Sequence, residues 1–250
     1  MVDDVLAKSF TLTGADYDRY RPGFPPAAAD VVMPHRVRTA LDLGAGTGKF
    51  TELLGGRAER VIAVEPSEPM LEILRSKLPG VEAHLGSAER IPMESEVADV
   101  VTVAQAFHWF DEEAACAEIA RVLTPGGTLG LIWNRFDPTC AWDHAAHRIA
   151  HPAVGDADVT TSTATHELPG FDFVRHEQIH SRERIRRDAY LGRWSTVSTF
   201  LVADEAARAE MFAAIEAVLD SDPETRDNDE YDLPIVCLLY TSDAADEEDS

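Results

Sequence analysis

Cysteine and lysine are both scarce in this chain of 250 residues. The three cysteines, Cys116, Cys140 and Cys237, stand far apart, with no CxxC pair and no Cys/His spacing, so the sequence indicates neither a disulfide framework nor a zinc site. Free thiols favour a reducing compartment. We therefore expect a cytoplasmic protein that holds no metal.

Long apolar runs are missing as well. No stretch approaches the roughly 20 apolar residues of a membrane span, and the N-terminus carries acidic residues where a signal peptide has a basic stretch. Positive charge is also in short supply, because 22 basic residues face 45 acidic ones and leave a net charge of −23. Such a field repels phosphate backbones and anionic lipid headgroups. Nucleic acid and membrane surfaces are therefore not expected partners, and the sequence does not indicate an oligomeric state.

Short apolar strands alternate with helical stretches from about Arg38 onward, which is typical of parallel β-α units with a sheet buried on both faces. The expected strands are Thr39 to Leu43, Arg60 to Glu65, Val81 to Leu85, Ala98 to Ala104 and Thr128 to Trp133. The expected helices are Thr47 to Leu54, Pro69 to Lys77, Glu112 to Val122, Asp188 to Leu201 and Asp204 to Leu219. The pattern predicts an α/β fold with a doubly wound, mostly parallel sheet.

The strongest motif is LDLGAGTGKF, in which Gly44, Gly46 and Gly48 follow an apolar strand and open a helix. Glycines there let the backbone pass close to a ligand, and the helix N-terminus beyond them offers unpaired N–H donors. The spacing is GxGxG with Asp42 two residues before the first glycine, whereas a dinucleotide fingerprint has GxGxxG and would need glycine in place of Lys49. The loop therefore suits the nucleoside and amino acid of S-adenosylmethionine, which has no pyrophosphate.

Glu65 ends the second expected strand, seventeen residues after Gly48. A carboxylate at that place can accept hydrogen bonds from both ribose hydroxyls of a nucleoside. The alternative is a solvated acid at the end of a strand. Because NAD and S-adenosylmethionine both present such a diol, Glu65 alone does not separate the two cofactors.

Four motifs in order resemble those of the class I S-adenosylmethionine-dependent methyltransferases: LDLGAGTG, VIAVEPSEPML, GSAERIP and RVLTPGGTLGL. Two further segments, YDRYRPGFPP and AQAFHWFD, resemble the small-molecule methyltransferases related to trans-aconitate methyltransferase. The resemblance implies a Rossmann-like sheet of seven strands, the last of them antiparallel and located at about Leu233 to Tyr240. It also implies one domain over residues 1–236, made of a cofactor-binding core (38–134), an N-terminal lid (1–37) and a variable cap with the final sheet elements (135–236).

The resemblance also assigns residues to the cofactor. The methionine moiety would be surrounded by Gly44, Ala45, Gly46, Thr47 and Gly48, and the ribose held by Glu65. The adenine would meet Ser87, Ala88 and Glu89 at its edge and Pro66 and Met70 on its face, with Asp42 and Gln105 completing the set. The family often has Asp where this chain has Ser87, and Pro66 and Met70 have ordinary core packing as an alternative role.

Residues 105–109 leave the fourth strand at its carboxyl end, where open α/β sheets place their ligands. Phe107 and Trp109 are candidates for the wall of an acceptor pocket, or they simply cap the sheet. His108 titrates near neutrality, so it is a candidate general base for a hydroxyl acceptor. A structural or substrate-positioning histidine is the alternative.

Tyr17, Tyr20 and Arg21 precede the first strand and are candidates for a lid over the site, with Arg21 pairing with a carboxylate of the cofactor or acceptor. Their alternative role is the surface of an N-terminal arm. With this set of residues, the expected activity is methyl transfer from S-adenosylmethionine to a small organic molecule, at a carboxylate or hydroxyl oxygen. The alternatives are a carbon methyltransferase acting on a quinone or lipid-like intermediate, a non-catalytic cofactor-binding module and, more distantly, an NAD oxidoreductase.

The C-terminus has two interpretations. Residues 220–250 carry twelve acidic residues and one basic residue, which is typical of a solvated acidic tail. Alternatively, the segment CLLYTSDAADE (237–247) resembles the translation of a transposase sequencing adapter, in which case residues 237–250 are a non-native acidic tail and the last strand of the sheet is doubtful.

Overall fold

The computed structural model describes residues 14–152 and 167–244. The chain divides into two compact units. Among the described residues, one unit consists of 23–134, 167–179 and 237–244, and we call it the glycine-loop unit. The other consists of 14–22, 135–152 and 180–236, and we call it the helical unit. The predicted arrangement of lid, core and cap within one methyltransferase domain stays a prediction.

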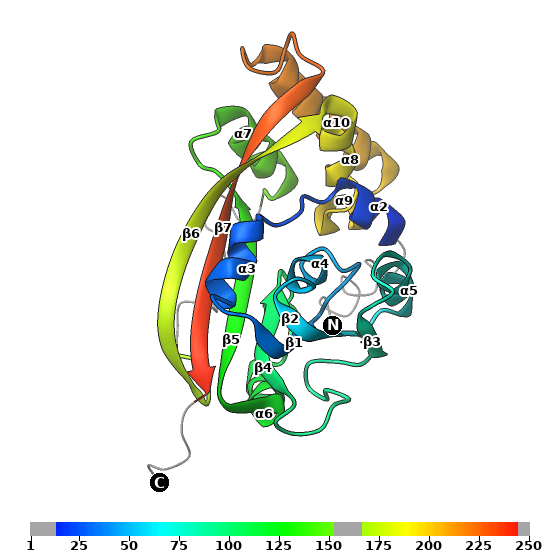
Figure 1. The fold of residues 1–250 in the computed structure, drawn as a ribbon. Coiled ribbons are helices and arrows are strands. Elements are labelled where there is room, and N and C mark those ends of the chain that lie inside the picture. Colours follow the sequence, from blue (N-terminus) through cyan, green and yellow to red (C-terminus); the bar gives the residue numbers. More distant parts are fainter. Residues whose placement is uncertain (1–13, 153–166, 245–250) are drawn as a thin grey trace. The chain divides into compact units, whose positions relative to one another are not determined.

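Four neighbouring parallel strands belong to the glycine-loop unit (Figure 1). They are β1 (Val37–Leu43), β2 (Ala58–Glu65), β3 (Glu82–Leu85) and β4 (Ala98–Ala104). The last five residues of β1 and of β2 are all buried, as expected for strands covered on both faces of a sheet. The positions of these strands agree with the predicted ones to within a few residues.

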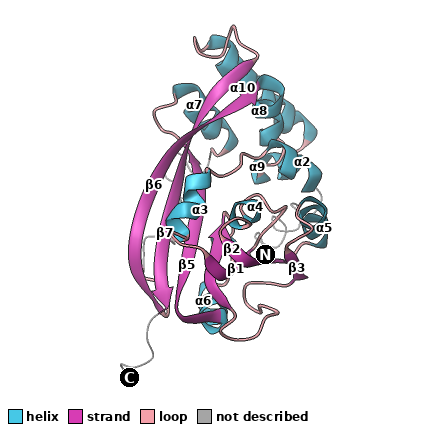
Figure 2. Ribbon diagram, in the orientation of Figure 1, coloured by secondary structure: helices cyan, strands magenta, loops and turns pink. Residues whose placement is uncertain are grey.

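Three long strands complete the sheet: β5 (Leu123–Phe136), β6 (Phe171–Arg186) and β7 (Glu230–Ala244). The order across the sheet is β3-β2-β1-β4-β5-β7-β6, with β5 parallel to β4 and β7 as the antiparallel strand (Figure 1). The predicted α/β fold with a doubly wound, mostly parallel, seven-stranded sheet is therefore confirmed. The distribution of strands and helices along the chain is shown in Figure 2.

The described part of the glycine-loop unit contains five helical segments. They are α3 (Pro26–Val32), α4 (Thr51–Leu54), α5 (Glu68–Lys77), the short 3-10 helix η1 (Phe107–Trp109) and α6 (Glu112–Val122). α6 starts after Asp111, whose side chain accepts a hydrogen bond from the backbone N–H of Ala114 at 3.1 Å. α4 begins at Thr51 rather than at the predicted Thr47, because Gly48 has a φ of 84° and lies outside the helical region.

The helical unit contains α2 (Gly14–Tyr20), α7 (Ala141–Ala150), α8 (Arg187–Trp194), α9 (Ser198–Val202) and α10 (Glu205–Ser221). The single helix predicted over 188–201 is in fact two helices. It breaks where Ser195 Oγ and Thr196 Oγ1 donate to the carbonyls of Gly192 and Arg193 at 2.6 and 2.7 Å, because such local side-chain bonds compete with helical ones. α7 was not predicted from the sequence.

The second half of β7 is part of the core of the glycine-loop unit. Cys237 and Leu239 pack in the same buried cluster as Ala40 of β1 and Val100 of β4, and Thr128 Oγ1 donates to Asp243 Oδ1 at 2.9 Å. The strand predicted at 233–240 is therefore present. The adapter origin of residues 237–247 stays a prediction, and residues 245–247 lie outside the described part of the chain.

All three cysteines are free and buried, and burial raises the pKa of each thiol to about 12. No described helix combines the length and apolar character needed to cross a membrane. Within residues 14–152 and 167–244, no three His, Cys, Asp or Glu side chains are grouped so that they could hold a metal ion.

Candidate functional site

The loop between β1 and α4 has an unusual backbone. Gly44, Gly46 and Gly48 have φ angles of 67°, 56° and 84°, in the left-handed region that only glycine visits without steric cost. The loop is anchored to β2, because the N–H groups of Gly44 and Ala45 donate to the carbonyl oxygen of Val64 at 2.8 and 3.2 Å. The glycine spacing in the sequence therefore fixes a loop that runs over the carboxyl end of the sheet.

The three glycines differ in what surrounds them. A Cβ atom on Gly44 would lie 2.6 Å from Cβ of Ala106, and one on Gly48 would lie 3.0 Å from Leu74 of α5. A Cβ on Gly46 would meet no protein atom nearer than Sδ of Met70, at 4.0 Å. The outer glycines are thus required by protein packing, whereas the middle glycine faces space that the described residues do not fill.

Glu65, at the end of β2, holds this loop from the other side. Its Oε2 accepts a hydrogen bond from the N–H of Gly46 and its Oε1 accepts one from the N–H of Ser67, both at 2.9 Å. Burial raises the pKa of Glu65, the two amides oppose this, and the nearby charge of Asp42 adds to it. Each carboxylate oxygen has a second lone pair, so Glu65 keeps acceptor capacity for a ligand.

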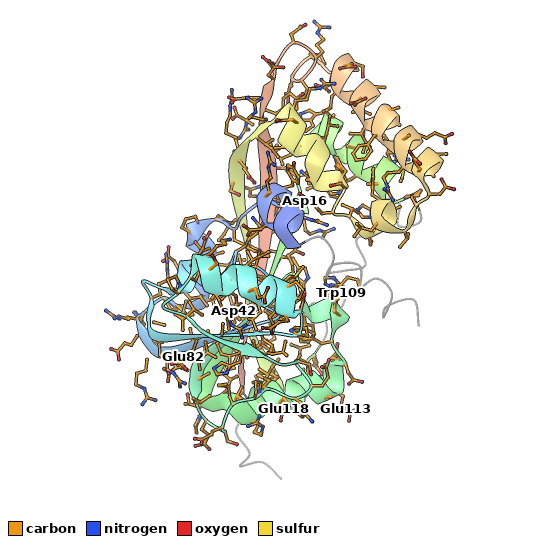
Figure 3. All side chains as sticks on the ribbon, turned by 90° about the vertical axis from the view of Figure 1, so that its right-hand side faces the viewer. Asp16, Asp42, Glu82, Trp109, Glu113 and Glu118 are labelled. Carbon is orange, nitrogen blue, oxygen red and sulfur yellow. The ribbon has the colours of Figure 1, made fainter. Side chains whose placement is uncertain are left out.

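Asp42, labelled in Figure 3, lies inside the protein with 1% of its surface exposed. Its two oxygens accept hydrogen bonds from Thr51 Oγ1 of α4 at 2.6 Å and from Thr102 Oγ1 of β4 at 2.8 Å. Burial raises its pKa to about 6, against the opposing effect of these hydroxyl groups. Asp42 therefore ties the start of the glycine loop to two neighbouring elements.

The residues predicted to meet an adenine follow β2 and β3. Pro66 and Glu89 are exposed, Ser87 is half-buried, and Met70 and Ala88 are buried. The carboxylate of Glu89 accepts a hydrogen bond from the N–H of Asp111 at 3.2 Å, which links this segment to the start of α6.

One residue near these was missed by the sequence analysis. Leu85, the last residue of β3, is paired in register with Glu65 and keeps 54% of its surface exposed. An exposed leucine at the carboxyl end of a strand, beside a buried carboxylate, is a candidate contact for a flat apolar ring. The signal in the sequence was an apolar residue at the end of the third expected strand.

Gln105 directly follows β4 with a φ of 58°, a left-handed conformation that costs a non-glycine residue about 1–2 kcal/mol. It is held there by its N–H, which donates to the carbonyl oxygen of Ile132 at 2.8 Å, and by its Nε2, which donates to that of Asn134 at 2.7 Å. The backbone therefore turns sharply at this end of the sheet.

The three residues of η1 have different surroundings. Phe107 is buried with 2% exposed and packs edge-on against Phe110, the ring centroids 5.8 Å apart. Trp109, labelled in Figure 3, keeps 38% of its surface exposed. The half-buried ring of His108 lies 4.9 Å from that of Trp109. An exposed indole and an imidazole thus lie next to the turn made by Gln105.

The three candidate lid residues belong to the helical unit. Tyr17 is in α2, and its side chain lies outside the described part of the structure. The ring of Tyr20 lies against Gly192 of α8, since a Cβ there would be 2.7 Å from it. Arg21 donates from Nε to Thr196 Oγ1 at 2.9 Å and from Nη2 to the Thr196 carbonyl oxygen at 3.0 Å. The role of these residues as a lid stays a prediction.

Known proteins similar to this chain agree on one family. The family model described as "Methyltransferase domain" matches residues 41–131. An uncharacterized methyltransferase of Mycobacterium tuberculosis is 36% identical over 241 residues, which covers 96% of this chain and 97% of that protein. This chain belongs to the methyltransferase family.

Two further comparisons place the methyltransferase in its family. The solved structure of a candidate type II methyltransferase from Anaeromyxobacter dehalogenans superimposes with a TM-score of 0.64 at 27% identity, covering 90% of this chain and 97% of that one. A malonyl-[acyl-carrier protein] O-methyltransferase of Methylococcus capsulatus is 40% identical over 97 residues, 36% of this chain and 35% of that protein. The chain is thus an S-adenosylmethionine-dependent methyltransferase, and the glycine loop and Glu65 both lie inside the matched segment.

Proposed function

We propose that this methyltransferase binds S-adenosylmethionine along the glycine loop and transfers its methyl group to an oxygen of a small organic acid or alcohol. The observation that carries the proposal is the unfilled space at Gly46, bordered by the carboxylate of Glu65. The space at the middle glycine fits a ligand that passes close to the backbone. The acidic oxygens beside it fit the hydroxyl groups of a ribose.

The assignment of residues follows from these positions. Glu65 accepts the ribose hydroxyls while its bonds to Gly46 and Ser67 hold it in place. Ala45 and Thr47 border the methionine moiety together with the three glycines. Asp42 does not contact the cofactor but positions the start of the loop through its hydrogen bonds with Thr51 and Thr102.

The adenine lies between the segment after β2 and the segment after β3. Its faces meet Leu85, Pro66 and Met70, and its edge meets Ser87, Ala88 and Glu89. The exposed surface of Leu85, beside Glu65 in the register of β2 and β3, supports this arrangement.

The bound cofactor supplies an electrophilic methyl group on a sulfonium, so the protein needs to provide orientation and a dry pocket rather than strong activation. Phe107 and Trp109 contribute apolar surface to the acceptor pocket, and Gln105 fixes the turn from which they project. A carboxylate acceptor attacks without a base. For a hydroxyl acceptor, His108 removes the proton.

One observation supports an oxygen acceptor, and another supports a small molecule. The relative from Methylococcus capsulatus is an O-methyltransferase, and the segments YDRYRPGFPP and AQAFHWFD resemble small-molecule methyltransferases of the trans-aconitate type. The net charge of −23 disfavours a nucleic-acid acceptor. The same proposal includes a reducing, cytoplasmic compartment, in which three buried thiols stay free.

The test is calorimetric titration with S-adenosylhomocysteine, with NADH as the competing ligand. We expect saturable one-to-one binding of the former alone, and a loss of at least tenfold in affinity in Glu65→Gln, which keeps the size of the side chain but removes its charge. The matched control is Glu82→Gln, because Glu82 is an exposed acid of β3 that pairs with Arg60 at 2.6 Å and lies away from the loop. Binding of NADH, or an equal loss in both variants, would refute the assignment.

A second assay addresses the acceptor. The wild-type enzyme and the His108→Gln variant are each incubated with methyl-labelled S-adenosylmethionine and a panel of carboxylic acids and alcohols. The proposal expects the variant to retain ester formation and to lose transfer to hydroxyl groups. Equal loss of both activities would exclude the role of His108 as a base.

A further inference from the structure

Arg193 of α8 is a nearly buried cation in the helical unit. Its side chain is 11% exposed, and its guanidinium carbon lies 4.6 Å from the centre of the Trp194 ring and 5.0 Å from that of Tyr190. Both aromatic residues are fully buried. The guanidinium is thus held in one place on an aromatic surface, which favours a flat cation of this kind.

Few of the donors of Arg193 are used by the protein. A guanidinium carries five N–H donors, but Arg193 makes one side-chain hydrogen bond to the described residues, from Nη2 to Nε2 of His147 at 3.0 Å. The neighbouring carboxylate oxygen, Asp143 Oδ1, is 3.6 Å from Nη1 and already accepts a bond from the hydroxyl of Tyr190 at 2.8 Å. Most of its donors therefore have no acceptor within hydrogen-bond distance among the described residues, and 11% of the side chain stays exposed.

His147 is neutral and adds no second positive charge beside Arg193. Because its Nε2 accepts from Arg193, the ring is in the neutral form with its proton on Nδ1. Burial holds the pKa of His147 well below its usual range, and the charges of Arg193, His151 and Arg21 lower it further. The positive charges of Arg193 and Arg21 thus both favour the neutral form of His147.

The cluster also has a counterion and flat walls. Asp143 is 1% exposed, and its Oδ2 has no hydrogen-bond partner among the residues that the structure describes. The ring of Phe136 stacks on His144 at 5.2 Å with an interplanar angle of 10° and lies 4.6 Å from the ring of His147. All of these residues belong to the helical unit.

We propose that Arg193 forms a binding site for the carboxylate of a small planar organic acid, with Asp143 as the positioning residue that holds the guanidinium. A carboxylate matches the fork of N–H donors in a guanidinium and pairs with it through two charge-assisted bonds. The rings of Phe136, His144 and His147 are partly exposed and suit a flat acid better than a tetrahedral phosphate. In a protein with a net charge of −23, an anion needs such a local cation to bind at all.

The test uses benzoate as the probe and benzamide as its uncharged counterpart, without cofactor, and follows binding by calorimetry. The wild type should bind benzoate saturably and benzamide at least tenfold more weakly. Arg193→Gln should lose at least tenfold in benzoate affinity, and Arg193→Lys should lose less, because it keeps the charge without the fork. Arg187→Gln is the matched control on the same helix, since Arg187 pairs with Asp220 at 2.6 Å, and it should bind as the wild type does.

S-adenosylhomocysteine is titrated into the same samples, which separates this proposal from the function proposed above. Binding of S-adenosylhomocysteine by Arg193→Gln shows that the variant is folded, so that its loss of benzoate binding supports the site. Equal affinity for benzoate and benzamide, or unchanged benzoate binding in Arg193→Gln, overturns the site while the methyl donor assignment stands. Benzoate binding without any S-adenosylhomocysteine binding supports the site and overturns the methyl donor assignment.

Discussion

Replacing Gly46 by alanine separates two reasons for a glycine, its backbone conformation and the space beside it. The φ of 56° places alanine in the left-handed region, which costs about 1–2 kcal/mol of folding free energy. Apart from its neighbours in the chain, the nearest described atom to the new Cβ is Sδ of Met70, at 4.0 Å. Because small domains are stable by roughly 5–15 kcal/mol, the variant should fold, with the N–H of Gly46 still bonded to Glu65.

The new methyl group is expected to lower the affinity for the ligand. If the methionine moiety passes over Gly46, a Cβ there removes its closest contact with the backbone, and affinity for S-adenosylhomocysteine should fall at least tenfold, about 1.4 kcal/mol. Calorimetric titration gives the affinity, and urea unfolding of the same sample gives the change in stability.

Gly126→Ala is the matched control, because Gly126 has a φ of 72° and a Cβ there would also meet nothing within 4 Å, but it lies in β5 near the opposite end of β4. It should lose a similar amount of stability and keep full affinity. If Gly46→Ala binds within twofold of the wild type, or if both variants lose binding equally, the argument from the unfilled space is wrong.

Three further outcomes are expected. Burial raises the pKa of Asp42 from 3.8 to about 6, so the ionised carboxylate costs the folded state about 3 kcal/mol above pH 6. Between about pH 4 and pH 7 the wild type should therefore lose about this much free energy of unfolding relative to Asp42→Asn. A difference in urea stability between the two proteins that does not change with pH would contradict this. Gly44→Ala should be far more destabilising than Gly46→Ala in thermal unfolding, because its Cβ would lie 2.6 Å from that of Ala106; equal melting temperatures would show that the loop moves aside. Deletion of residues 237–250 removes buried side chains of β7, each worth on the order of 2 kcal/mol, so the shortened chain should be insoluble on expression, whereas a soluble and cooperatively unfolding product would show that this half of the strand is dispensable.

The parts of the fold that the sequence predicts are those set by local pattern. The strands β1 to β4 are short apolar runs, and the side chain of Asp111 caps the first turn of α6, so their positions follow from neighbouring residues alone. β6 is an edge strand in which most side chains are exposed, and it is stable only because β7 pairs with it. α7 buries Trp142 and Asp143 on one face while its histidines interrupt the apolar periodicity.

The same distinction applies to the site. The GxGxG spacing predicts the glycine loop because each positive φ needs a glycine. The partners of Asp42 are not predictable in this way, since Thr102 reaches it only through the parallel register of β1 and β4, sixty residues apart in the chain. The surroundings of Arg193 are likewise assembled from α7 and α8, which are remote in sequence and joined by packing.

Because lysine is scarce, reagents that modify amines react at few positions of this chain. The chain has three lysines, of which Lys8 lies outside the described residues. Lys49 directly follows the last glycine of the loop, and Lys77 Nζ donates to the carbonyl oxygen of Thr47 at 3.3 Å. A reagent that acylates amines modifies the whole surface of an ordinary protein, but in this one its targets besides Lys8 and the N-terminal amine are the two lysines that flank a single loop. Mass-spectrometric footprinting of these amines can therefore follow occupancy of the loop with almost no background from the rest of the molecule.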